Sequence, residues 1–247
     1  MEQSAIAYLD LMEKTLTGMI YQDNPIDPWS KDVGFDMMKR LNGWDWPAQA
    51  HTMIGFYRLR NIRELALHVI DNNVPGDFVE TGVWRGGATI YMRAILKILE
   101  IKDRTVWAAD SFEGLPEPEE RCPDDRGDVH HSYADLRVSL EDVQSNFERY
   151  GLLDEQVHFL KGWFKDSLPS APIARVSILR LDGDMYASTI DALNALYHKV
   201  SQGGFIIIDD YEAVPACKKA ITDFRDKHGV TAPIIPIDKI GAYWQKD

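Results

Sequence analysis

The first third of the chain has its apolar residues at helical spacing. They recur every three to four positions over residues 5–22 and again over 51–69. This period predicts amphipathic helices, and a shorter helix is expected over 30–41. No linker or low-complexity tract separates this part from the rest. We therefore expect residues 1–73 to form a helical extension that packs on the core and helps to cover a site, without being an independent domain.

From residue 74 onward, short apolar runs alternate with helical patterns. Strands are expected over 77–83, 105–112, 157–162, 175–182 and 204–210, and helices over 86–100, 137–150, 186–200 and 214–228. Such alternation predicts a parallel sheet covered by helices on both faces. Two further strand-like stretches, 233–238 and 241–246, are joined so tightly that they must be antiparallel neighbours. The pattern predicts an α/β fold over residues 74–247, with a doubly wound, mostly parallel seven-stranded sheet that ends in an antiparallel C-terminal hairpin.

The first expected strand ends in a glycine-containing turn, Glu80-Thr81-Gly82-Val83-Trp84-Arg85-Gly86-Gly87. Glycines let a ligand approach the backbone, and open α/β sheets bind ligands at the carboxyl ends of their strands. A dinucleotide-binding turn would read Gly-x-Gly-x-x-Gly, but Trp84 occupies its second glycine position. The spacing Glu80-x-Gly82-x-x-x-Gly86 is similar instead to the first motif of S-adenosylmethionine (SAM) methyltransferases. An ordinary strand-to-helix turn is the alternative interpretation.

The second expected strand favours a nucleotide-like cofactor. It is apolar and ends in an acid, Asp110. In nucleotide-binding α/β folds an acid at this position hydrogen-bonds the ribose hydroxyls. Asp110 is therefore the candidate ribose ligand.

Two later strands end in aspartates, at Asp182 and at the pair Asp209-Asp210. Parallel strands end on the same edge of a sheet, so these carboxylates should gather beside the cofactor turn. Crowded carboxylates repel one another unless they are protonated or bound to a cation, and Mg²⁺ prefers carboxylate oxygens. We predict a Mg²⁺ site formed by Asp182, Asp209 and Asp210. The alternative is that some acids cap the following helices, and for Asp184 a capping or supporting role is favoured.

Composition narrows the class of protein. The chain has 247 residues, 45% of them hydrophobic and 27% charged, which is ordinary for one globular α/β domain. The net charge is −12 and no basic run is present, which argues against nucleic-acid binding. Two cysteines form no disulfide framework, and no apolar run could span a bilayer, so a cytoplasmic protein is expected. The proline- and acid-rich segment 113–135 is either a lid or a disordered insertion.

Taken together, these motifs identify a family resemblance. The chain resembles the TylF-like macrocin O-methyltransferases, SAM- and metal-dependent enzymes that methylate sugar hydroxyls of macrolide and aminocoumarin natural products. The resemblance covers nearly the whole chain. The stretches that carry it include Tyr8-Leu9-Asp10-Leu11, Ala50-His51-Thr52-Met53-Ile54-Gly55, Glu80-Thr81-Gly82-Val83-Trp84-Arg85-Gly86-Gly87, Asp110-Ser111-Phe112, Gly162-Trp163-Phe164-Lys165-Asp166, Asp182-Gly183-Asp184 and Ile207-Ile208-Asp209-Asp210-Tyr211.

The resemblance implies roles for particular residues. Asp182, Asp209 and Asp210 would hold the Mg²⁺, and Asp182 would also be the general base. The acceptor would be a small-molecule glycoside, and the enzyme a homodimer or higher homo-oligomer whose N-terminal segment and lid close over the site. The residues expected to bind SAM are Thr52, Met53, Glu80, Gly82, Gly86, Asp110, Ser111 and Trp163.

Three rival functions use parts of the same pattern. A catechol-type O-methyltransferase would keep the cofactor and the metal but act on an aromatic diol. Trp84 in the glycine turn and the C-terminal hairpin argue against an NAD-dependent oxidoreductase. A regulator that only binds SAM would have no use for the aspartate cluster.

Overall fold

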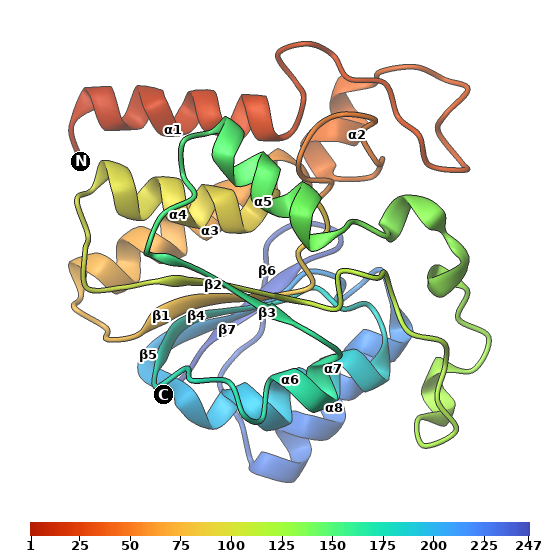
Figure 1. Ribbon diagram of the computed structural model, residues 1–247. Coiled ribbons are helices and arrows are strands. Elements are labelled where there is room, and N and C mark those ends of the chain that lie inside the picture. The colour runs from red at the N-terminus through yellow and green to blue at the C-terminus, as the bar shows by residue number, and fades with distance from the viewer.

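The protein is a seven-stranded sheet between two layers of helices (Figure 1). The computed structural model describes all 247 residues. The strand order is β3-β2-β1-β4-β5-β7-β6. The strands are β1 (Asp77–Thr81), β2 (Val106–Asp110), β3 (Val157–Lys161), β4 (Val176–Leu181), β5 (Val200–Ile208), β6 (Ile235–Pro236) and β7 (Ala242–Gln245). The helices are α1 (Gln3–Leu16), α2 (Met37–Asn42), α3 (Gly55–Asp71), α4 (Gly87–Ile98), α5 (Leu140–Arg149), α6 (Phe164–Ser167), α7 (Tyr186–Leu196) and α8 (Pro215–His228).

The sheet has the predicted topology. The first five strands are parallel neighbours. The last two are antiparallel, because β7 pairs with β5 and β6 pairs with β7. Helices α3, α4 and α5 cover one face, and α6, α7 and α8 cover the other (Figure 1). The predicted doubly wound sheet with an antiparallel C-terminal hairpin is therefore confirmed.

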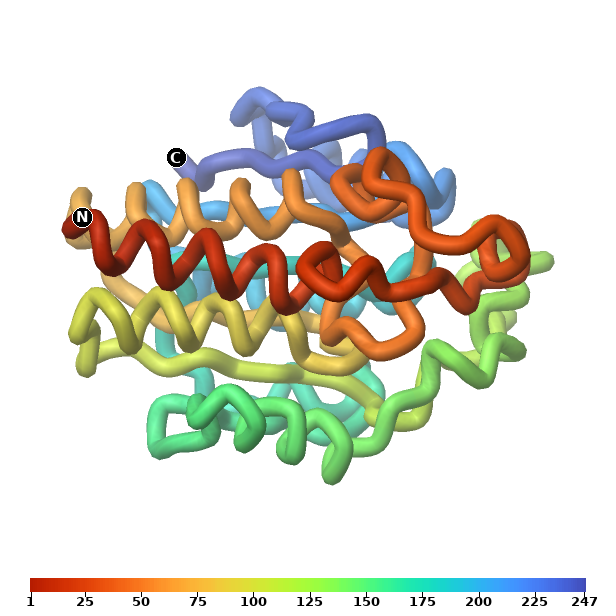
Figure 2. The backbone as a smooth tube through the Cα atoms, turned by 90° about the horizontal axis from the view of Figure 1, so that it is seen from above, coloured from red at the N-terminus to blue at the C-terminus, as the bar shows by residue number.

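The N-terminal helices share the core of the sheet. Figure 2 shows α1 lying alongside α3 and α4. Leu9 and Leu16 of α1 and Leu59 of α3 belong to the same apolar cluster as Phe78 of β1. Because this cluster contains residues from both parts, the extension and the sheet share one core, and burial of its apolar surface stabilises the contact between them.

Several predicted element bounds are wrong. The helix expected over 5–22 ends at Leu16, since Gly18 has φ +70° and a Cβ there would lie 2.8 Å from Asp23 and 2.9 Å from Ala50. The helix expected over 30–41 is found at Met37–Asn42, where the Asp36 carboxylate caps the amides of Met38 and Lys39. Strand β5 begins at Val200, earlier than expected, and β6 has only two residues. The short helix α6 had no signal in the sequence pattern.

The segment 113–135 folds onto the core. It contains two short 3₁₀ helices, η1 (Pro123–Asp125) and η2 (His130–Ser132), and a third, η3 (Ala134–Leu136), begins at its end. The Asp125 carboxylate accepts hydrogen bonds from the amides of Tyr186 at 2.6 Å and Ala187 at 2.9 Å. It therefore caps the first turn of α7 from outside. None of the helices combines the length and the hydropathy that a membrane span requires.

Candidate active site

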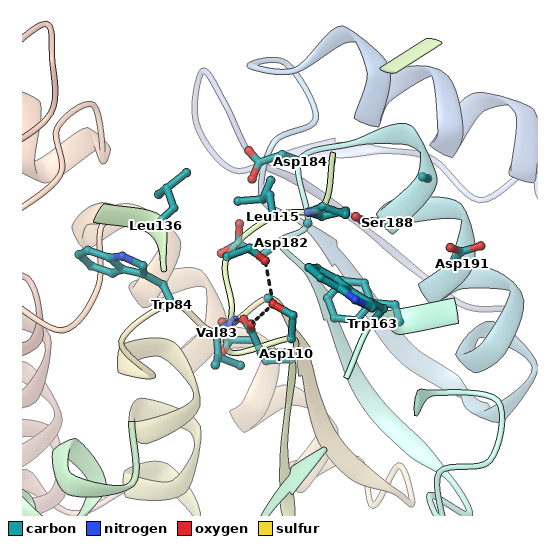
Figure 3. A pocket seen from close by; sticks show the side chains of 18 of the residues that line it. Val83, Trp84, Asp110, Leu115, Leu136, Trp163, Asp182, Asp184, Ser188 and Asp191 are labelled. Atoms are coloured by element: carbon teal, nitrogen blue, oxygen red, sulfur yellow. Dashed lines mark hydrogen bonds between the residues drawn. The ribbon is translucent and has the colours of Figure 1, made fainter. Parts of the chain in front are cut away.

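A cavity of about 310 Å³ lies at the carboxyl edge of the sheet (Figure 3). Its walls come from the ends of β1, β2 and β4, from residues 114–121 and from the turn after β3. Eight of the predicted site residues line this cavity: Thr52, Met53, Glu80, Gly82, Asp110, Ser111, Trp163 and Asp182. Asp209 and Asp210 do not line the cavity but form a carboxylate cluster with Asp182, and Gly86 is also outside the cavity wall.

Gly82 is required by the close approach of two strand ends. Its φ is +87°, and a Cβ at this position would lie only 1.7 Å from the Asp182 carbonyl oxygen. Only glycine fits such a contact. The glycine turn and Asp182 are thus held side by side, which puts the cofactor motif next to the aspartate cluster.

Gly86 faces the helix layer. It has φ +85° at the start of α4, and a Cβ there would lie 2.9 Å from the Val143 side chain of α5. The neighbouring Gly87 is pressed against the backbone of His51, where a Cβ would come within 2.3 Å of the carbonyl oxygen. These two glycines therefore serve the packing of α4, and the structure does not bring Gly86 together with the other predicted cofactor ligands.

Asp110 shapes the floor of the cavity. Its Oδ2 accepts a 2.7 Å hydrogen bond from the Val83 amide, and its Oδ1 accepts one of 2.7 Å from the Phe112 amide. Burial raises the pKa of Asp110, although both backbone bonds favour the carboxylate. The neighbouring Ser111 hydroxyl donates to the Gly114 carbonyl at 2.7 Å. Asp110 thus joins the turn after β1 to the turn after β2.

Glu80 is held by a residue that the sequence analysis missed, Arg180 of β4. Arg180 is fully buried, and its Nη1 donates to Glu80 Oε1 at 2.6 Å and to Asp182 Oδ2 at 2.7 Å. Its Nη2 donates to Asp209. Burial raises the pKa of Glu80 to about 7, and the attraction of Arg180 opposes this rise. An arginine within an apolar strand that ends in an acid was the available signal, because a buried charge needs partners.

The three predicted metal ligands do come together. One oxygen each of Asp182, Asp209 and Asp210 lie within 4.8 Å of one another. Asp210 Oδ2 is buried and has no hydrogen-bond partner. Burial raises the pKa of Asp182 to about 6, and burial together with neighbouring carboxylates raises the pKa of Asp210 well above its usual range. Converging carboxylate oxygens, one of them unpartnered, are a donor set that fits a hard divalent cation.

Asp184 does not cap a helix, so the capping role expected for it is wrong, and the supporting role is the one left. It lies on the cavity wall with φ +53°. The first turn of α7 is capped by Asp125 instead. Burial and the nearby Asp182 raise the pKa of Asp184 to about 7. It therefore adds a further acid to the cavity wall beside Asp182.

A second missed residue is Arg58 of α3. Its Nη1 donates to Asp209 Oδ2, so both oxygens of Asp209 have guanidinium partners. Arg58 is separated from Asp209 by 151 positions in the sequence, and its position in a helical stripe gave no sign of this contact. The two arginines offset part of the negative charge that the aspartates bring to the site.

The chain is similar to known proteins over nearly its whole length. Residues 5–246 match the family model described as Macrocin-O-methyltransferase (TylF). The 8-demethyl-8-(2,3-dimethoxy-alpha-L-rhamnosyl)-tetracenomycin-C 4'-O-methyltransferase of Streptomyces olivaceus is 50% identical over 246 residues, 99% of this chain and 94% of the relative. The demethyldecarbamoylnovobiocin O-methyltransferase of Streptomyces niveus is 51% identical, over 97% of this chain and 93% of the relative.

A solved structure shows the same fold. The O-methyltransferase NovP superposes with a TM-score of 0.93 at 51% identity, covering 98% of this chain and 99% of that one. The seven-stranded sheet is therefore that of class I SAM O-methyltransferases. The chain belongs to the macrocin-O-methyltransferase family and is an O-methyltransferase.

Proposed function

We propose that the protein transfers a methyl group from SAM to a sugar hydroxyl of a glycosylated natural product, with the help of a divalent cation such as Mg²⁺. The observation that carries the proposal is the position of Asp182. Asp182 lines the same cavity as Asp110, and it also belongs to the aspartate cluster. The relative from Streptomyces olivaceus is named for a rhamnosyl-tetracenomycin, which supports a glycosylated acceptor. The relative from Streptomyces niveus is named for demethyldecarbamoylnovobiocin, another natural product.

The cofactor half of the site would be formed by the ends of β1 and β2. SAM supplies an electrophilic methyl group when it is bound. Asp110 Oδ2 accepts one backbone bond and keeps a lone pair for a ribose hydroxyl, whereas Oδ1 accepts from the Phe112 amide and also lies 3.3 Å from the Ser111 hydroxyl. Glu80 already has Arg180 and Thr89 as partners, so it would act mainly by fixing the electrostatics of the cavity floor. Trp163 and Met53 would supply apolar surface on the cavity wall.

The metal half would prepare the acceptor hydroxyl. Asp182, Asp209 and Asp210 would hold the cation, which supplies positive charge that makes a nearby hydroxyl easier to deprotonate. Asp182 is the proposed base, because its side chain is 25% exposed and Arg180 holds only its Oδ2. Its Oδ1 therefore stays available to accept the hydroxyl proton. Holding the hydroxyl in line with the methyl group can contribute about 7–11 kcal/mol.

The cover of the site would be residues 113–135. Ion pairs hold this part of the chain to the core, from Glu119 to Lys165 at 2.7 Å and from Arg121 to Asp191 at 2.6 Å. These side chains also line the cavity, so opening the segment would admit ligands. Hydrogen exchange in residues 113–135 should slow when SAM and acceptor are bound. Equal, fast exchange with and without ligands would remove the lid from the proposal.

A panel of acceptors tests the proposal. The enzyme should add one methyl group, detected by mass spectrometry, to a rhamnosylated polyketide in the presence of SAM and Mg²⁺. The matching aglycone and a simple catechol should remain unmodified. Methylation of the catechol in place of the glycoside would show a catechol-type enzyme. The enzyme is also expected to be a homodimer or a higher homo-oligomer. Light scattering on the purified protein measures its mass, and a monomer would contradict this expectation.

A further inference from the structure

Arg58 sits at the meeting point of three segments that are far apart in the sequence. Its Nη1 donates to Asp209 at the end of β5. Its Nη2 donates to the Gly43 carbonyl at 3.1 Å, in the turn that ends α2. Its Nε lies 3.3 Å from Asp238 Oδ2, in the turn between β6 and β7. One guanidinium thus joins the N-terminal extension and the C-terminal hairpin to a carboxylate of the aspartate cluster.

The surroundings of Arg58 are shaped to hold this side chain. A Cβ on Gly43 would lie 2.3 Å from Arg58 Nη2, and a Cβ on Gly241 would lie 2.9 Å from Arg58 Cδ. Asp238 is fixed in turn, since its Oδ1 accepts from the amides of Ile240 at 2.8 Å and Gly241 at 2.7 Å. Arg58 itself is 4% exposed. Glycines on both sides and a fixed acid leave the guanidinium little freedom to move.

We infer that Arg58 is a positioning residue of the cation site, which sets the orientation of the Asp209 carboxylate before the cation binds. This inference rests on the proposed metal site. Arg58 holds Asp209 Oδ2 while Arg180 holds Oδ1, so the plane of the carboxylate is fixed from both sides. Groups that hydrogen-bond metal ligands tune the metal in this way, and losing one typically costs ~10–100-fold in metal affinity.

Charge repulsion alone would have the opposite effect on cation affinity. A guanidinium beside a cation site repels the cation, so its removal should tighten binding if charge alone matters. If Arg58 acts by positioning, its removal should weaken binding. The sign of the change in cation affinity therefore separates the two roles.

The test is a calorimetric titration in which Mn²⁺ alone is added to EDTA-stripped protein. Arg58→Met should weaken Mn²⁺ binding ~10–100-fold and leave the SAM dissociation constant unchanged. Arg58→Lys should fall between this variant and the native protein, because an ammonium can reach Asp209 without bridging all three segments. Saturating Mg²⁺ should restore much of the turnover of Arg58→Met. The matched control is Arg60→Met on the same helix, whose ion pairs go to Asp10 and Glu13, and it should bind Mn²⁺ as the native protein does.

A charge-neutral variant guards against misfolding. Gly241→Ala should push the Arg58 side chain aside without removing a charge, so it too should weaken Mn²⁺ binding. Unchanged or tighter Mn²⁺ binding in folded Arg58→Met overturns the inference. If circular dichroism shows that Arg58→Met is unfolded, native-like binding by Gly241→Ala overturns it instead. If the native protein binds no Mn²⁺, the proposed metal site itself fails, and the inference fails with it.

Discussion

Two neighbouring aspartates should respond in opposite directions to the same substitution. Asp209 accepts hydrogen bonds from Arg58 and Arg180, one on each oxygen. In Asp209→Asn the amide would turn a donor toward one guanidinium and leave buried charges without a partner. Breaking a buried ion pair in this way costs about 3–5 kcal/mol of unfolding free energy. Asp210 is buried beside other carboxylates, which disfavour the charged form, so Asp210→Asn removes an unfavourable charge and should stabilise the metal-free protein by about 1 kcal/mol.

Urea unfolding at neutral pH in EDTA measures both changes. Adding Mg²⁺ should then stabilise the native protein by about 2.7 kcal/mol at a concentration 100 times the dissociation constant. Asp210→Asn should gain much less from Mg²⁺, because it has lost a ligand with a free oxygen. If both variants destabilise the metal-free protein by similar amounts, the assignment of Asp209 as clamped and Asp210 as free is wrong.

Three further predictions concern single residues. Asp182→Asn should lower turnover by ~10²–10⁴-fold while SAM affinity is unchanged, and excess Mg²⁺ should not restore the rate. Near-native turnover would show that another residue is the base. Asp110→Ala should weaken SAM binding by about 1.5–3 kcal/mol in calorimetry, and an unchanged affinity would remove Asp110 from the cofactor site. Burial and the nearby Arg149 and Arg85 lower the pKa of His51 to about 4. As the pH falls, this histidine is therefore protonated in the unfolded chain at a higher pH than in the folded protein. Stability should drop by about 2 kcal/mol between about pH 7 and pH 5 from this group, and His51→Gln should remove that share of the pH dependence in urea titrations.

The sheet and the aspartate cluster were predictable because local patterns determine them. Apolar runs that end in acids mark strands, and parallel strands end on one edge. The sequence alone therefore places Asp110, Asp182 and Asp209 at the same edge of the sheet. The short turn at Asp238 likewise showed that the last two strands are antiparallel.

The partners of these acids could not be predicted, because they depend on side chains that meet across the fold. Arg58 reaches Asp209 from a helix whose sequence shows only an amphipathic stripe. Gly86 belongs to a cofactor-like spacing, but its missing Cβ makes room for Val143 of α5. The helix expected to run on to residue 22 ends at Leu16, because Gly18 must fit against Asp23 and Ala50. In each case the packing of distant segments decides the role, and the local pattern does not contain it.

The proposed reaction is cation-dependent methyl transfer to a sugar hydroxyl. Its most direct test is the transfer of isotope-labelled methyl from SAM to a rhamnosylated polyketide by enzyme stripped with EDTA, before and after Mg²⁺ is added. We expect no labelled product without the cation, and full labelling of a sugar hydroxyl once Mg²⁺ is restored. Undiminished transfer in EDTA would contradict the account, since Asp182, Asp209 and Asp210 would then have no cation to hold.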